Sequence, residues 1–156
     1  MKSFLARIMF FFLGRGFQAA YSLDAGIQAE IADWPESTTI LMRIFPSGPA
    51  MTVAKRNDRI YYLGLEETPA DFVITFKSLD GALLVLLGRI SIAQAYAEHR
   101  FVMYGDIMAV GMPLVRCLYQ VENYLFPRFI THKLFNRFPI KSVNSLRVYL
   151  KILLAC

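Results

Sequence analysis

The residues of this chain that could carry out chemistry are few and widely spaced. Its two histidines, His99 and His132, lie 33 positions apart, and no cysteine or carboxylate stands at metal-ligand spacing beside both of them. The chain contains no phosphate-binding loop, no Gly-x-Ser-x-Gly nucleophile motif, no His-Glu-x-x-His and no Cys-x-x-Cys. We therefore expect a protein that is not an enzyme and that uses neither a metal ion nor an organic cofactor.

One glycine pattern imitates a dinucleotide-binding loop. Residues 14–19 read Gly-Arg-Gly-Phe-Gln-Ala, and the apolar residues 8–13 could supply the strand that precedes such a loop. Residues 21–31, however, are not followed by a second strand that ends in an acidic residue, which a dinucleotide fold requires. The favoured interpretation is a hinge or break within a helix.

The composition is unusually apolar for a chain without a membrane span. Hydrophobic residues make up 56% of the sequence, and the mean hydropathy is +0.41. The longest run without a formal charge is the eleven residues 44–54, whereas a spanning helix needs about 20 apolar residues. The apolar surplus therefore predicts a large core, a cavity that holds an apolar ligand, a protein partner or contact with a bilayer surface.

Two features bear on the location of the protein. The apolar run at residues 8–13 is shorter than the roughly 7–15 residues of the apolar part of a secretory signal. The two cysteines, Cys117 and Cys156, are compatible with a reducing compartment. These features favour a cytoplasmic location, and the basic tail described next adds the expectation of a peripheral position at the inner face of the membrane.

The positive charge of the chain is concentrated near its C-terminus. Residues 1–126 hold eleven basic and twelve acidic residues, a net charge of −1, whereas residues 127–156 hold six basic residues and no acid. Leucines at helical spacing alternate there with basic residues, the pattern of an amphipathic helix at an anionic membrane. The residues expected to contact a membrane are Arg128, Lys133, Arg137, Arg147, Leu150, Lys151 and Leu154. The same pattern also fits a tail whose apolar face docks on the rest of the protein.

The spacing of apolar residues predicts strands followed by helices. The expected helices are Lys2 to about Ala32 with a soft point at 14–16, a helix between Ser78 and Gly88, a short helix at 92–100, and a helix from Asp106 towards Phe126 that kinks near 111–113. The expected strands are 38–45, 51–55, 59–63, 72–77 and 101–104. This order predicts an α+β fold with about five strands in a mostly antiparallel sheet and helices on one face.

The segment from Asp71 to Leu114 resembles the sterol carrier protein 2 (SCP-2) family. In that family a strand leads into a helix ending in glycine, then a short helix with an Ala-Phe pair, a strand, a Gly-Asp or Gly-Asn turn, and a helix of small and apolar residues. The matching residues here are 72–77, Gly88, Ala95-Tyr96, 101–104, Gly105-Asp106 and 107–114. Two positions depart from the family pattern, because His99 stands where many members have glycine and Tyr96 where they have phenylalanine.

The resemblance implies an SCP-2-like lipid-binding domain in residues 1–126, built around an apolar cavity, followed by a basic amphipathic tail in residues 127–156. It implies a non-enzymatic lipid binding or transfer protein that holds an acyl, phospholipid or isoprenoid chain in an apolar tunnel. The residues expected to line that tunnel are Ile74, Phe76, Leu84, Leu87, Tyr96, Met103, Met108 and Met112.

Two other functions remain open from the sequence. The pair His99-Arg100 resembles the bacterial branch of the family, which includes an accessory factor for ubiquinone biosynthesis; this implies a protein that presents isoprenoid quinone precursors to biosynthetic enzymes at the membrane. A nucleic-acid-binding protein is a further alternative, but the chain has no recognisable reader motif and its tail is too apolar for a phosphate-binding arm. The expected partners are therefore a lipid, an anionic membrane and biosynthetic enzymes, and not nucleic acid.

Overall fold

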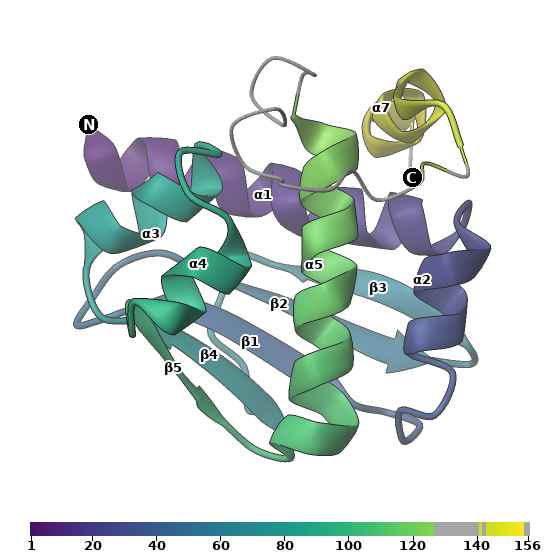
Figure 1. The fold of residues 1–156 in the computed structure, drawn as a ribbon, viewed down its shortest axis with the longest axis horizontal. Coiled ribbons are helices and arrows are strands. Elements are labelled where there is room, and N and C mark those ends of the chain that lie inside the picture. Colours follow the sequence, from purple (N-terminus) through teal and green to yellow (C-terminus); the bar gives the residue numbers. More distant parts are fainter. Residues whose placement is uncertain (127–140, 142, 155–156) are drawn as a thin grey trace.

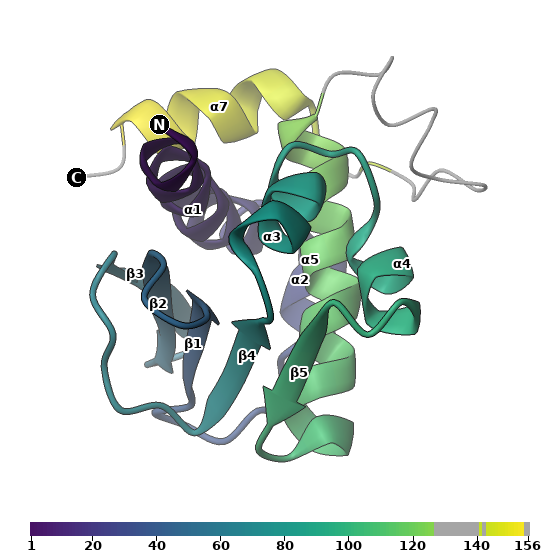
Figure 2. The ribbon, with the colours of Figure 1, turned by 90° about the vertical axis from the view of Figure 1, so that its left-hand side faces the viewer.

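A five-stranded sheet covered by helices forms the body of the molecule. The computed structural model describes residues 1–126, 141 and 143–154. The strand order is β3-β2-β1-β4-β5, and Figures 1 and 2 show the helices gathered on one face of this sheet. β1 (Thr39–Ile44) runs parallel to β4 (Phe72–Phe76), and the other neighbouring pairs are antiparallel. The expected α+β fold with a mostly antiparallel sheet is confirmed.

The remaining strands follow from local turn chemistry. β2 (Ala50–Arg56) and β3 (Arg59–Gly64) form a hairpin whose two turn residues, Asn57 and Asp58, both have φ near +50°. A two-residue hairpin turn of type I′ needs positive φ at both positions, which Asn and Asp tolerate better than most residues. β5 (Phe101–Tyr104) pairs with β4 at the other edge of the sheet.

The single helix expected from Lys2 to about Ala32 is two helices in the structure, and the break between them lies at another place than expected. α1 (Lys2–Tyr21) is followed by α2 (Ala25–Glu30), which starts where the Asp24 carboxylate accepts hydrogen bonds from the backbone amides of residues 26 and 27. The break predicted at residues 14–16 is wrong, since α1 runs straight through them. A Cβ atom at Gly14 would lie 2.4 Å from the Tyr62 ring, so the glycine lets α1 approach β3 closely.

The two short helices begin and end largely as expected. α3 (Leu79–Leu86) starts at Ser78, whose hydroxyl accepts from the Gly81 amide at 3.1 Å, and the chain then turns at Gly88 with φ +64°. α4 (Ile92–Ala97) is capped in the same way by Ser91. His99, which follows it, has φ +53°, a conformation that glycine adopts without strain. This explains why glycine suits that position in the family pattern.

The last helix of the body begins with a wide turn. Asp106 accepts a hydrogen bond from the Ala109 amide at 2.9 Å, and the Gly111 amide donates to the carbonyl of Asp106, five residues earlier. This makes Ile107–Gly111 a π-helical turn (η1), and α5 (Met112–Leu125) continues from it with proline in its first turn. In place of the kink expected near residues 111–113, the structure has a π turn that ends at Gly111 and leads directly into α5.

The described part of the tail packs against the body. α7 (Ser145–Leu154) contacts α1 and α5, and its Val148 and Ile152 are almost fully buried. Figure 2 shows α7 lying over α1 on the side away from the sheet. Among the described residues, no helix combines the length and the hydropathy needed to cross a bilayer.

Candidate functional site: an apolar pocket between the sheet and the helices

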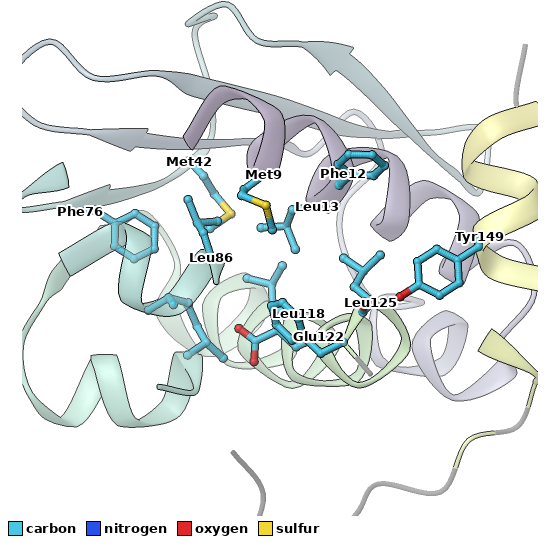
Figure 3. A pocket seen from close by; sticks show the side chains of 13 residues that line it. Met9, Phe12, Leu13, Met42, Phe76, Leu86, Leu118, Glu122, Leu125 and Tyr149 are labelled. Atoms are coloured by element: carbon cyan, nitrogen blue, oxygen red, sulfur yellow. Dashed lines mark hydrogen bonds between the residues drawn. The ribbon is translucent and has the colours of Figure 1, made fainter. Parts of the chain in front are cut away.

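A pocket of about 260 Å³ lies between the helical layer and the sheet. It reaches from the neighbouring strands β1 and β4 to the C-terminal half of α5, and Figure 3 shows side chains from both layers converging on it. The described residues that line it are Met9, Phe12, Leu13, Met42, Phe76, Val85, Leu86, Ile92, Leu118, Glu122, Leu125, Phe126 and Tyr149. All but Glu122 and Tyr149 have wholly apolar side chains.

Helical and strand periodicity bring these side chains to one place. On α5, Leu118, Glu122 and Leu125 are spaced by four and three positions, which puts them on one face of the helix. On α1, residues 9, 12 and 13 form the equivalent face. Met42 and Phe76 come from neighbouring strands, and each is fully buried on the side of the sheet that the helices cover.

Glu122 is the only carboxylate among the described lining residues. Its side chain is buried, and its Oε2 atom has no hydrogen-bond partner. Burial raises the pKa of this carboxyl from 4.5 to about 8, opposed by a hydrogen bond from the backbone of Ile92. At neutral pH the group is therefore mostly an uncharged carboxylic acid, which can donate one hydrogen bond and accept others.

Tyr149 brings the tail helix into the site. Its ring lines the pocket from α7, and its hydroxyl donates a hydrogen bond to the backbone carbonyl of Leu125. The docking of α7 on the body therefore completes one wall of the pocket.

The residues expected from the sequence to line a tunnel are mostly elsewhere. Phe76 alone of the eight is among the described residues that line this pocket. Of the others, Ile74 is fully buried in the core, Leu84, Leu87 and Met103 are half-buried, and Tyr96, Met108 and Met112 are exposed. Tyr96 does contact the core side of the sheet, because its ring lies 5.8 Å from that of Phe101, which packs on Phe76.

Met108 and Met112, which follow the Gly-Asp turn, show why most residues expected from the sequence do not line the pocket. Met108 and Met112 are four positions apart and would share a face in a regular α-helix. They do share a face here, but it is the exposed one, and the positions that the body buries are Val110 and Leu114, which are also four apart. Met108 is left 79% exposed. On α3, similarly, the pocket is lined by residues 85 and 86 instead of 84 and 87.

The expected membrane-contact residues fall into two groups. Arg128, Lys133 and Arg137 lie outside the described residues. Arg147, Leu150, Lys151 and Leu154 all lie on α7 and are exposed. One face of α7 therefore docks on the body through Val148 and Ile152, while its leucines remain on the surface.

Glu122 and Tyr149 are the lining residues that sequence reasoning missed. For Glu122 a signal exists, because an acidic residue four positions after Leu118 and three before Leu125 interrupts an otherwise apolar helix face. For Tyr149 none exists, because the sequence does not reveal on which side α7 packs.

Of the comparisons with known proteins, the one with solved structures finds similar chains. No protein-family model matches the chain, and neither does any curated protein. Similar solved structures include a UbiJ-SCP2 ubiquinone synthesis protein, with 11% identity and a TM-score of 0.45 over 67% of this chain and 88% of that one. A conserved hypothetical protein from Thermus thermophilus, described as a suspected sterol carrier protein, has 17% identity and a TM-score of 0.46 over 70% and 85%.

The palmitated SCP2L2 of Aedes aegypti is a third such structure, with 15% identity and a TM-score of 0.41 over 65% of this chain and 92% of that one. At these identities and TM-scores the likeness carries no argument about a ligand. Any conclusion on function has to come from the pocket itself. The solved structures that resemble this chain thus include proteins described as UbiJ-SCP2, SCP2L2 and Sterol Carrier Protein 2 Like 2.

Proposed function

We propose that the protein binds an apolar, lipid-like molecule in the pocket between the sheet and the helices, and that it acts as a carrier and not as an enzyme. The observation that supports this most strongly is the lining, which is apolar except for one carboxyl and one tyrosine hydroxyl. An apolar ligand would gain about 25 cal/mol for each Å² of apolar surface removed from water.

The size of the pocket fits this proposal. Its 260 Å³ is close to the lower end of small-molecule sites, which hold about 300–1,000 Å³. An engineered apolar cavity of about 150 Å³ stays dry and takes up benzene, so an apolar pocket of this size favours an apolar occupant over water. A ligand with a long chain would fill the pocket with part of its length and extend beyond Phe126 or Tyr149.

The exposed face of α7 supports a second part of the proposal, contact with an anionic membrane. Leu150, Leu153 and Leu154 are 49%, 74% and 74% exposed, and Arg147 and Lys151 lie on the surface beside them. No acidic residue occurs on α7. Apolar side chains flanked by basic ones bind the interface of acidic lipids. Because Tyr149 of the same helix lines the pocket, α7 would bring the pocket to the source of its ligand.

Filling the pocket tests the first part. Met9 is half-buried at the pocket, so Met9→Trp can place its ring inside without overpacking the core. We expect this variant to bind the apolar fluorophore Nile red at least about tenfold more weakly, while Phe4→Trp, an exposed position on the same helix, leaves binding unchanged. Native mass spectrometry of protein purified without detergent should show a bound lipid that Met9→Trp lacks. Equal binding by the two variants would reject this pocket as the site.

The narrower function, presentation of isoprenoid quinone precursors to biosynthetic enzymes, stays a prediction from the sequence resemblance. A biosynthetic enzyme that co-purifies with the protein would favour it. Identification of the bound lipid by mass spectrometry would separate it from the carriage of acyl chains or phospholipids.

A further inference from the structure

Glu122 needs an explanation that the proposed function does not give. A carrier for purely apolar chains would be better served by an apolar side chain, since burying a carboxyl without partners for its oxygens costs free energy. Oε2 nevertheless faces an apolar pocket with no hydrogen-bond partner, while the nearby Tyr149 hydroxyl is already bonded to the Leu125 carbonyl. The pocket therefore offers one buried polar atom, Oε2, that the fold does not use.

We infer that the Glu122 carboxyl is the hydrogen-bonding partner of the ligand's polar group, and that the ligand is an apolar molecule carrying one uncharged hydroxyl or carbonyl oxygen into the pocket. This inference rests on the proposed function, because it requires a ligand in that pocket. It adds the chemical class of the ligand and the orientation in which it binds, with its polar end towards α5.

The protonation state of the carboxyl supports an uncharged ligand. Burial raises the pKa of Glu122 to about 8, so near pH 7 its O–H can donate to a carbonyl and its oxygens can accept from a hydroxyl. Among the described lining residues, the other ionisable one is Tyr149 of α7. On α5 itself, burial and the Glu122 charge raise the pKa of Tyr119, three residues before Glu122. The described lining residues from α1, β1, β4, α3 and α4 carry no ionisable group.

The same geometry disfavours an anionic head group at this end of the pocket. A fatty-acid carboxylate beside Glu122 would be a second buried negative charge, or would have to take up a proton on entering. No lysine or arginine is among the described residues that line the pocket and could neutralise it. A fatty acid would therefore bind with its methyl end inwards, where Glu122 can only hinder it.

Matched ligands separate these arrangements. Dodecanol, dodecyl methyl ketone, dodecane and dodecanoate share an alkyl chain and differ in the end group. We would measure their dissociation constants by displacement of Nile red from the wild type, Glu122→Gln, Glu122→Met and a control, Glu66→Gln. The control makes the same chemical change as Glu122→Gln at an exposed position away from the pocket.

The informative quantity is the affinity for dodecanol or the ketone divided by the affinity for dodecane. One buried hydrogen bond is worth about 0.5–1.5 kcal/mol, which corresponds to a factor of about 2 to 13. We expect E122M to lower this ratio by about tenfold, E122Q to change it by less than about threefold, and E66Q to leave it unchanged. Glu122→Ala should lower the ratio in the same way, so the test does not depend on E122M folding.

Each outcome tests either the proposed function, the role of Glu122 or the class of ligand. If dodecane, dodecanol and the ketone all fail to bind the wild type, the proposed function falls and this inference with it. If they bind and the ratio is the same in all variants, Glu122 merely supports the fold, and the inference is overturned while the proposed function stands. Dodecanoate that binds as tightly as dodecanol, and loses affinity in E122M, would overturn the ligand class.

Discussion

Asp24 and Glu122 are two buried carboxyl groups, and their surroundings differ completely. Asp24 is 3% exposed; one of its oxygens accepts from the Gly26 and Ile27 amides, and the other accepts from the Tyr124 hydroxyl at 2.5 Å and from Gln120. Glu122 is 5% exposed, faces apolar side chains and has one oxygen without a partner. The two groups are thus equally removed from water but not equally compensated.

This difference in hydrogen bonding assigns different roles to the two carboxyl groups, support of the fold for Asp24 and ligand binding for Glu122. The contacts of Asp24 start α2 and tie it to α5, so its burial is compensated within the fold. The burial of Glu122 is compensated only in part, by a backbone hydrogen bond at Ile92. A residue that stabilises the fold has its hydrogen-bond partners inside the protein, whereas a ligand can supply the partner that the Glu122 Oε2 atom lacks.

Removing the Asp24 carboxyl, whose hydrogen-bond partners lie inside the protein, should have the largest effect on stability. Asp24→Ala leaves the buried Tyr124 hydroxyl and two amides at the start of α2 without their acceptor. We expect the free energy of unfolding to fall by about 3–5 kcal/mol, as for the loss of one member of a buried charged network. Urea denaturation measures this change. Asp33→Ala, at an exposed acid, should change stability by less than about 0.5 kcal/mol, and an equally small change for Asp24→Ala would contradict the comparison.

The uncompensated carboxyl should make the ligand-free protein less stable as pH rises. The pKa of Glu122 is about 8 in the folded protein against an ordinary 4.5, so between these values unfolding releases its proton. Its contribution to stability therefore declines from pH 4.5 to pH 8, by at most about 1.4 kcal/mol per pH unit. The wild type should lose about 2–3 kcal/mol relative to Glu122→Gln between pH 5 and pH 8. Parallel stability profiles for the two proteins would show that Glu122 is ionised in the fold.

α7 shows a similar contrast between side chains that the body buries and side chains that it leaves exposed. The expected effect of changing the exposed ones is smaller. Leu150→Ser together with Leu153→Ser should weaken binding to vesicles of anionic lipid by about tenfold, roughly 1.4 kcal/mol, because these leucines are exposed and are available to a bilayer. Stability should hardly change. Co-sedimentation at low and high salt measures the binding, and salt should weaken it without abolishing it, since part of it is apolar.

Val148→Ser provides the control on the opposite face of α7. This residue is 1% exposed, so its replacement should lower stability. If the double leucine variant binds vesicles as well as the wild type, the exposed face of α7 is not a membrane contact.

The sheet and most helix ends could be predicted because they depend on local signals. The caps at Ser78 and Asp106 and the turn at Gly88 follow from residue type and position alone. The expected break at Gly14 was wrong, because its glycine serves close packing against Tyr62, a contact between residues 48 positions apart in the sequence.

The pocket was harder to predict because it depends on helix rotation. After the Gly-Asp turn the body buries Val110 and leaves Met108 on the surface, and on α3 residues 85 and 86 line the pocket instead of 84 and 87. Side chains from α1 and α7 meet at the pocket although nothing in the sequence links them. Glu122 was visible as an acid on an apolar face, but its meaning required knowledge of what it faces.

Contacts between a bound ligand and individual side chains would show directly whether the ligand lies in this pocket with its polar end at Glu122. We would record intermolecular nuclear Overhauser effects between dodecanol and the methyl and aromatic groups of the protein. The pocket predicts contacts from the chain to Phe76, Leu86 and Leu118, with the carbon next to the hydroxyl nearest Glu122. Contacts to Met103, Met108 and Met112 instead would place the ligand at the other end of α5 and contradict the account.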